Sequence, residues 1–376
     1  MAIFATPAGT RDRLFSDCAR RRETENKLAR CFYARGYREI ETPALEYYDT
    51  LVRSGNPVTQ EELFILPERR GRLCALRPDM TTPIARVAAS KVDCSVPRRF
   101  YYLQDVFRAS GMPGRVQVRQ AGVELIGAAG LRADTEVIAL AAEALSTTGM
   151  YRIEIGHAGF FRKLARALGA GEDFVEELRA LVNRKNFASL PDLLSEYRES
   201  PAYRALCRLP QLFGGEEVLD EAFALADGCV GTEELDTLRA IYRELQAAGF
   251  GPNIMLDLGL VHHMDYYTGV VFRGYVAGAG TPVLQGGRYD SLLGCLGHPA
   301  PATGFAADVD ALTELRADEE TEDDIRFVVH VGTGALRRAM DYCDSRPGQC
   351  VCSPYESEAE SRELAGKLSA KLVVIE

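Results

Sequence analysis

The sequence contains no run of about 18 apolar residues, the length that a membrane-spanning helix requires. Its first residues also lack the basic start and apolar core of a signal peptide, so we expect no export. Without export, the ten cysteines are expected to stay reduced. These absences favour a cytoplasmic protein.

An excess of positive charge is also missing, because 44 lysine and arginine residues face 54 aspartate and glutamate residues, which gives a net charge of −10. An acidic chain can still carry a local basic groove, but it lacks the overall charge of a nucleic-acid binder. The length of 376 residues, with 47% hydrophobic and 26% charged residues, is typical of a soluble protein of two or three domains.

The cysteine spacing does not predict a metal site. Cys343, Cys350 and Cys352 lie close together in sequence, with His330 upstream, but zinc sites usually contain cysteines separated by two to four residues. Cys350 and Cys352 have one residue between them, and we expect their thiols to point to opposite faces of a strand. We therefore predict scattered core thiols, no metal and no other cofactor.

The first part of the chain alternates helical and extended patterns. The predicted elements are a helix at 16–36, a strand at 37–43 that ends at Pro43, strands at 100–108 and 116–126, a helix at 133–148 and a strand at 151–157. The two long strands flank residues 109–115, which are rich in turn formers. This arrangement predicts an antiparallel sheet with one polar face.

The second part of the chain begins with a predicted helical insertion at about 159–249, broken at Gly214-Gly215. Its expected helices are at 174–182, 190–197 and 233–247, followed by short strands at 254–258, 269–278 and 282–284. Residues 317–324 contain six acidic residues and are expected to form a linker. Residues 325–376 alternate strand and helix, so we predict three parts: a core at 1–316, the linker, and a small parallel α/β unit.

Six ordered blocks of sequence within residues 6–312 resemble those of histidyl-tRNA synthetases. Asp265-Tyr266-Tyr267 matches the first histidine signature, and Gln285 to Asp290 matches the second. The other blocks are Arg77-Pro-Asp-Met-Thr81, Val106-Phe-Arg108, the return strand with Gln120 and Glu124, and Gly304-Phe-Ala306. The resemblance implies an α+β fold of the class II aminoacyl-tRNA synthetase type, with an antiparallel sheet flanked by helices.

The same resemblance implies a pocket for free histidine. Asp79 and Thr81 are expected to bind the ammonium group, and Arg108 is expected to pair with the carboxylate, where a guanidinium is strongest. Glu124 and Tyr267 are expected to bind the imidazole nitrogens. The remaining site residues are Gln120, Tyr266, Gly286 and Gly287, the last two because glycine allows close backbone approach. Taken singly, each charged residue could equally be an exposed charge or a satisfied buried pair.

Departures from the enzyme pattern concern ATP and the reaction. His262 and His263 replace the arginine and glycine of the first histidine signature, and Ser110 replaces a glutamate. Gln117 and Ala311 stand where the enzymes have arginines. Since losing even one preorganised charge typically costs on the order of 100- to 1000-fold in rate, we predict no histidine activation and no catalytic residues. The short tail without a basic stripe also argues against tRNA binding.

A histidine pocket without activation chemistry resembles the regulatory subunits of ATP phosphoribosyltransferase. That resemblance implies a short-form catalytic subunit as partner, histidine feedback on the first step of histidine biosynthesis, and a homodimer within a hetero-oligomer. Two alternatives stay open: a histidine sensor that serves another partner, and a working histidyl-tRNA synthetase, which Ala311 and His262 oppose.

Overall fold

The computed structural model describes residues 4–53, 58–69, 71–109, 114–261, 266–316 and 325–376. The chain forms two compact units, one of residues 1–11 and 24–315 and the other of residues 12–23 and 316–376. The predicted linker at 317–324 lies outside the described residues, and a domain boundary near residue 316 remains a proposal. No helix in the described ranges is long and apolar enough to cross a bilayer.

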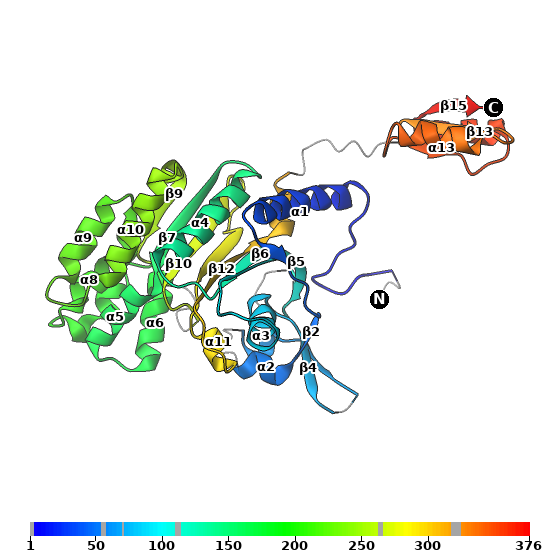
Figure 1. Ribbon diagram of the computed structural model, residues 1–376. Helices are drawn as coiled ribbons and strands as arrows, with labels where there is room; N and C mark the ends of the chain where they lie inside the picture. The colour runs from blue at the N-terminus through cyan, green and yellow to red at the C-terminus, as the bar shows by residue number, and fades with distance from the viewer. Residues whose placement is uncertain (1–3, 54–57, 70, 110–113, 262–265, 317–324) are drawn as a thin grey trace. The chain divides into compact units, whose positions relative to one another are not determined.

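A large, mostly antiparallel sheet forms the centre of the first unit (Figure 1). Within the described residues its strand order is β1 (Arg38–Glu39), β5 (Arg98–Phe107), β6 (Gln117–Ile126), β12 (Ala302–Asp308), β11 (Leu284–Arg288), β10 (Val270–Val276), β7 (Tyr151–His157), β9 (Ile254–Asp257) and β8 (Phe213–Gly214). The β1–β5 and β7–β9 pairs are parallel, and the other neighbouring pairs are antiparallel. The predicted antiparallel fold is therefore confirmed.

The two long strands β5 and β6 pair along their whole length, from Arg98 opposite Ile126 to Phe107 opposite Gln117. Their bounds agree closely with the predicted strands. The predicted strand at 37–43 is much shorter than expected, because β1 pairs only at Arg38 and Glu39. Pro43, which ends that segment, has no N–H to extend a ladder.

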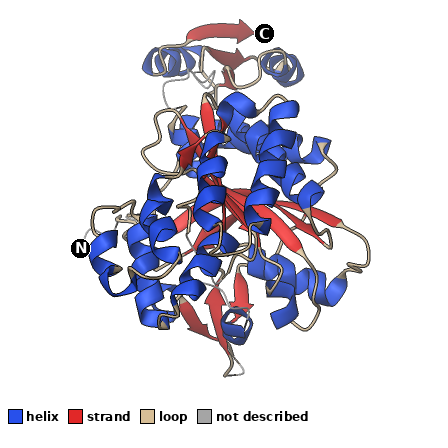
Figure 2. Cartoon of the chain, turned by 90° about the vertical axis from the view of Figure 1, so that its left-hand side faces the viewer, coloured by secondary structure: helices blue, strands red, loops and turns tan. Residues whose placement is uncertain are grey.

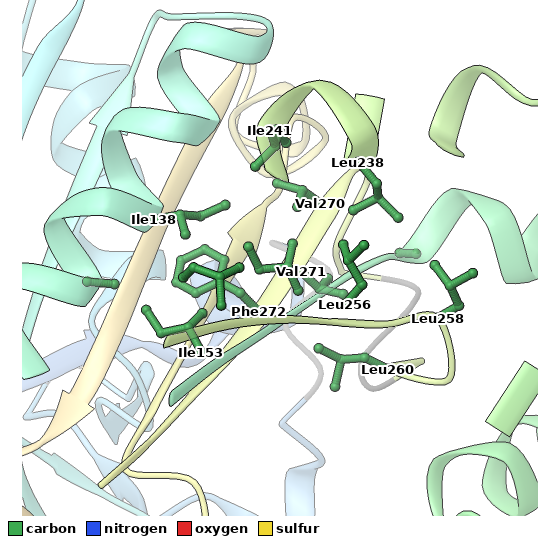
Figure 3. Close-up of a cluster of buried hydrophobic side chains, with 14 of the residues drawn as sticks. Ile138, Ile153, Leu238, Ile241, Leu256, Leu258, Leu260, Val270, Val271 and Phe272 are labelled. Carbon is green, nitrogen blue, oxygen red and sulfur yellow. The ribbon is translucent and has the colours of Figure 1, made fainter. Parts of the chain in front are cut away.

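One face of the sheet is buried beneath α1 (Ser16–Ala34), α4 (Leu131–Ser146) and α10 (Glu233–Ala247). Figure 3 shows Ile138 of α4 beside Phe272 of β10, and Ile241 of α10 beside Val270 of the same strand. The apolar stripes of these helices supply the burial that stabilises the sheet, about 25 cal/mol for each Å² of apolar surface removed from water. The helices predicted at 16–36 and 133–148 are confirmed.

The predicted insertion is helical, as Figure 2 makes visible. It contains α5 (Ala158–Leu168), α6 (Glu172–Asn183), α7 (Leu190–Leu193), α8 (Ala202–Arg208), α9 (Glu217–Ala226) and α10. The expected break at Gly214-Gly215 is instead the edge strand β8, which pairs with β9. On the other side of the large sheet, α3 (Thr81–Lys91) packs against β6 and against α11 (Leu292–Cys295).

A second, smaller sheet in the first unit contains β2 (Leu45–Tyr47), β4 (Leu73–Leu76) and β3 (Ile65–Pro67), with α2 (Tyr48–Arg53) beside it. All its strand pairs in the described part of the chain are antiparallel. Strand β4 ends at Leu76, directly before the Arg77 to Thr81 block, and α3 begins at Thr81. The block therefore connects the small sheet to α3.

The second unit has the small parallel sheet that the alternating pattern predicts. Its strands are β13 (Phe327–Val331), β14 (Cys350–Cys352) and β15 (Lys371–Ile375), and its helices are α13 (Leu336–Asp344) and α14 (Glu358–Lys367). The expectation that Cys350 and Cys352 point to opposite faces is wrong. Residues two apart in a strand share a face, and the thiols of both Cys350 and Cys352 raise the pKa of Cys343.

Candidate ligand-binding site

The face of the large sheet that is turned away from α4 carries the predicted site. On β6, Glu124 alternates with Val123 and Leu125 of the apolar core, because successive strand residues point to opposite faces. The register places Glu124 opposite Gly304 of β12, and Gly304 opposite Gly287 of β11. A carboxyl group and two positions without side chains thus lie side by side across three neighbouring strands.

The two glycines leave room for the functional side chains. A Cβ atom at Gly304 would lie 1.9 Å from Oε2 of Glu124, and one at Gly287 would lie 2.7 Å from the ring of Tyr267. Both contacts are far closer than real Cβ atoms make. Gly286 differs, because its Cβ would meet a core aromatic ring at 2.5 Å on the opposite face. The structure therefore places Gly287 beneath the ring of Tyr267 and Gly286 against the core ring of Phe272.

Glu124 is the buried acid at the centre of the site, only 2% exposed. Its Oε1 accepts a hydrogen bond of 2.7 Å from the hydroxyl of Thr81, and its Oε2 accepts one from the hydroxyl of Tyr289. Burial raises the pKa of Glu124 to about 8, and the nearby charge of Asp79 raises it further, while the two hydroxyl hydrogen bonds lower it. Glu124 is therefore mostly protonated at neutral pH in the free protein.

Tyrosine rings form a wall beside this acid. The ring of Tyr289 stacks on that of Tyr266 with centroids 5.4 Å apart, and Tyr266 meets Tyr267 edge to face at 5.1 Å. Burial raises the pKa of all three hydroxyls, so they stay neutral donors and acceptors. The hydroxyl of Tyr102 points at Gly122 and, within the described residues, is buried without a hydrogen-bond partner. Such a group is normally satisfied by water or a ligand.

The charged end of the site lies where β5 meets the start of α3. Asp79 accepts the backbone N–H of Thr82 at 2.7 Å, so it caps the N-terminus of α3. Arg108 donates from Nε to the carbonyl of Pro78, the residue before Asp79, at 2.9 Å. Arg77 is buried and donates to two backbone carbonyls, at 2.7 and 2.6 Å. This anchoring explains why the block can present an acid and a cation together.

The predicted site residues are thus largely gathered on one face. Thr81 touches Glu124, Tyr266 touches Tyr267, and Asp79 and Arg108 share Pro78 as a neighbour. Gln120 lies on the same face of β6 as Glu124, half-buried, opposite Asp308 of β12.

Asp265, His262, His263 and Ser110 lie outside the described residues. The expected losses at those positions are therefore sequence observations alone.

At the Gln120 end of this face, the charge of Arg115 is balanced by a carboxylate of the same chain. Arg115 makes a two-pronged ion pair with Asp308, at 3.2 and 2.7 Å. Asp308 also caps α12 (Val309–Glu314) by accepting the N–H of Ala311 at 2.9 Å. The side chain of Ala311 packs against the apolar core. Arg115 is therefore paired with a carboxylate, and Ala311 offers no cation.

Comparison with known proteins agrees with this geometry. The family model for histidyl-tRNA synthetase matches residues 9–312. The ATP phosphoribosyltransferase regulatory subunit of Clostridium acetobutylicum is 37% identical over 89% of this chain and 85% of its own length. That of Clostridium kluyveri is 34% identical over 98% of both chains. The chain belongs to the ATP phosphoribosyltransferase regulatory subunit family.

A solved structure gives the same assignment for the fold. A protein described as an ATP phosphoribosyltransferase regulatory subunit/histidyl-tRNA synthetase from Bacillus halodurans superposes with a TM-score of 0.87 and 30% sequence identity. The match covers 99% of this chain and 98% of that chain. The matched part of this chain includes the small parallel sheet after residue 325.

Sequence reasoning missed several residues that complete the pocket of this family member. Tyr289 bonds Glu124 directly, and Gly304 makes room for the same carboxyl group. Tyr102 and Gly122 form a second pair of this kind. The sequence did contain a signal for these residues, because residues two apart in a strand point to the same face. Tyr289 follows Gly287 by two residues, and Gly122 precedes Glu124 by two.

Proposed function

We propose that this chain binds free histidine and regulates a short-form catalytic subunit of ATP phosphoribosyltransferase without catalysing a reaction itself. Family membership supports the regulatory role, and the pocket supports the ligand. In this proposal the catalytic subunit carries out the first step of histidine biosynthesis in the cytoplasm. Histidine, the end product, occupies the Glu124 pocket and lowers that activity.

The proposed pose uses the two ends of the site. The ammonium and carboxylate groups of histidine lie at Asp79 and Arg108, and the imidazole lies between Glu124 and Tyr267. One observation carries the proposal: a deeply buried acid, held by the hydroxyls of Thr81 and Tyr289, lies beside stacked tyrosine rings on one face of the sheet. A protonated carboxyl group has one O–H to donate, and an imidazole nitrogen is a suitable acceptor for it.

The proposed absence of catalysis rests on Arg115 and Ala311. Adenylation needs cations at the α-phosphate, and their fixed placement supplies most of the rate enhancement. Arg115 is engaged by Asp308, and Ala311 cannot replace an arginine. These residues support a binding site that has lost its chemistry.

The test of regulation is inhibition of the reconstituted complex by histidine. Arg108→Ala should abolish inhibition while the catalytic subunit stays bound, because Arg108 is proposed to hold the ligand's carboxylate. Arg99→Ala is the matched control, since Arg99 lies on the same strand and pairs with Glu136 of α4 at 2.7 Å. Equal inhibition of wild type and Arg108→Ala would show that histidine acts elsewhere. Because linkage is reciprocal, the partner's substrates should also change histidine affinity by the same factor.

We also propose a homodimer within the hetero-oligomer, formed through α1 and the segment that ends at Pro43. An isologous interface presents each of its residues twice. Light scattering of the chain alone at micromolar concentration measures this directly. A monomer under those conditions would count against the proposed dimer without affecting the ligand assignment.

A further inference from the structure

Three thiols meet in the second unit, away from the Glu124 pocket. Cys343 lies in the last turn of α13, and Cys350 and Cys352 are the ends of β14. The sulfur atoms of Cys343 and Cys352 are 3.7 Å apart. Cys350 is close enough to raise the pKa of the Cys343 thiol. All three are half-buried, so a small reagent can reach them.

The backbone around the thiols is held by packing on both sides. β14 is paired with β13, with Cys350 opposite Phe327 and Cys352 opposite Val329. The end of α13 is fixed by Tyr342, whose ring meets that of Phe327 edge to face at 6.2 Å. A disulfide needs sulfurs about 2.05 Å apart. The two sulfur atoms, 3.7 Å apart, therefore have a short distance to close.

We propose that Cys343 and Cys352 form a reversible intramolecular disulfide when the protein meets a low-molecular-weight disulfide such as oxidised glutathione. A thiolate of the pair attacks the small disulfide, forms a mixed disulfide and releases one glutathione thiolate. The second cysteine, after losing its proton to that thiolate, attacks the protein sulfur and releases the second glutathione. Two protein thiols are oxidised, and one small disulfide is reduced to two thiols.

Either cysteine of the pair can make the first attack, because both are half-buried. Burial and the neighbouring thiols raise the pKa of Cys343 to about 12, so the reaction should be faster at alkaline pH. Cys350 supplies an adjacent thiol for exchange. The disulfide would link the end of α13 to β14 and close a loop of residues 344–351. The second unit would then be a site of redox modification.

The experiment incubates the full chain with oxidised glutathione, blocks free thiols, and digests it without reductant using a protease that cleaves before aspartate. Cleavage before Asp341 and Asp344 separates Cys343 from the two strand cysteines. The expected product is fragment 341–343 joined to the fragment that begins at Asp344, with two hydrogens lost. The free thiols in denaturant should fall by two from the original ten.

Variants assign the pair. The cross-linked fragment should persist in Cys350→Ser and in the matched control Cys207→Ser, a half-buried cysteine of the helical insertion. It should vanish in Cys343→Ser and in the double variant Cys350→Ser/Cys352→Ser. An unchanged count of ten thiols, a bridge between Cys350 and Cys352, or loss of the cross-link in Cys350→Ser alone would overturn the proposal.

Discussion

Replacing Glu124 by glutamine tests the pocket most directly, because it keeps the side-chain shape and removes the acid. Glutamine offers one carbonyl where Glu124 accepts hydrogen bonds from both Thr81 and Tyr289. It cannot share a proton with an imidazole. An unmade hydrogen bond of a buried group costs about 1–3 kcal/mol. That range corresponds to a weakening of histidine binding by roughly 5- to 150-fold.

The pH dependence sharpens this prediction. The bound pair of imidazole and Glu124 should hold one shared proton, whichever group carries it. Free Glu124 has a pKa of about 8, and a free imidazole has a pKa of about 6.5. Between these values the free partners already carry that one proton, so wild-type affinity should be constant there. Above pH 8 the wild type must take up a proton to bind histidine, whereas the Glu124→Gln variant binds it without proton uptake.

The ratio of the two dissociation constants is therefore the measured quantity, obtained by calorimetric titration of histidine from pH 6.5 to 9.5. Titration of the ligand itself is common to both proteins and cancels in the ratio. The wild-type advantage should be constant up to about pH 7.5 and then shrink by about tenfold for each pH unit above 8. An advantage that grows as the pH rises would mean that the ionised carboxylate binds a neutral imidazole, and it would refute the shared-proton account. Glu136→Gln on α4 is the control.

The same pKa makes a prediction for stability without ligand. Raising the pKa of Glu124 from 4.5 to about 8 means that the folded state holds a proton which the unfolded state has released. The resulting stabilisation is full below about pH 4.5 and is lost as the pH rises to 8. Relative to Glu124→Gln, the wild type should lose about 1.4 kcal/mol per pH unit within that window. Urea unfolding at pH 6 and 7.5 measures the difference, and equal slopes for both proteins would contradict the raised pKa.

Two further predictions concern the space and the chemistry of the site. Gly304→Ala places a methyl group 1.9 Å from Oε2 of Glu124, so it should weaken histidine binding and destabilise the fold by about 1–3 kcal/mol in urea unfolding. Gly280→Ala meets nothing within 4 Å and is the control; equal effects of both would show that the space at Gly304 is not needed. The wild-type chain should also catalyse no histidine-dependent exchange of pyrophosphate into ATP, because Arg115 is paired with Asp308 and Ala311 is uncharged. Exchange clearly above a no-enzyme control would restore the synthetase alternative.

The parts of the fold that depend on local periodicity could be predicted from the sequence. The strands at 100–108 and 116–126 are rich in aromatic and β-branched residues and flank turn formers, and they agree with β5 and β6 within two residues. The helix at 233–247 matches α10 residue for residue. The strand predicted at 37–43 was too long, because β1 pairs with β5 only at Arg38 and Glu39. The residue types at 40–43 do not show where this pairing stops. The pairing of Gly214 with β9 was missed for the same reason.

The candidate site divides in the same way. The family resemblance predicts Asp79, Arg108, Glu124 and Tyr267 as histidine-binding residues, and that assignment stays a prediction. Their placement could not be predicted, because Glu124 meets Tyr289 across 165 positions and Arg115 meets Asp308 across 193. Such contacts depend on strand order and register.

The sequence by itself therefore determined the family, the main helices and strands, and the kind of ligand to test, since motifs and periodicity are local properties. Only the tertiary structure decided that Glu124 is a mostly neutral acid at pH 7, because the degree of burial sets the cost of a charge. It also decided that Gly304 and Gly287 accommodate Glu124 and Tyr267, while Gly286 packs in the core. Finally, it gathered three cysteines that we had predicted to be scattered, because a helix end and a strand pack against each other.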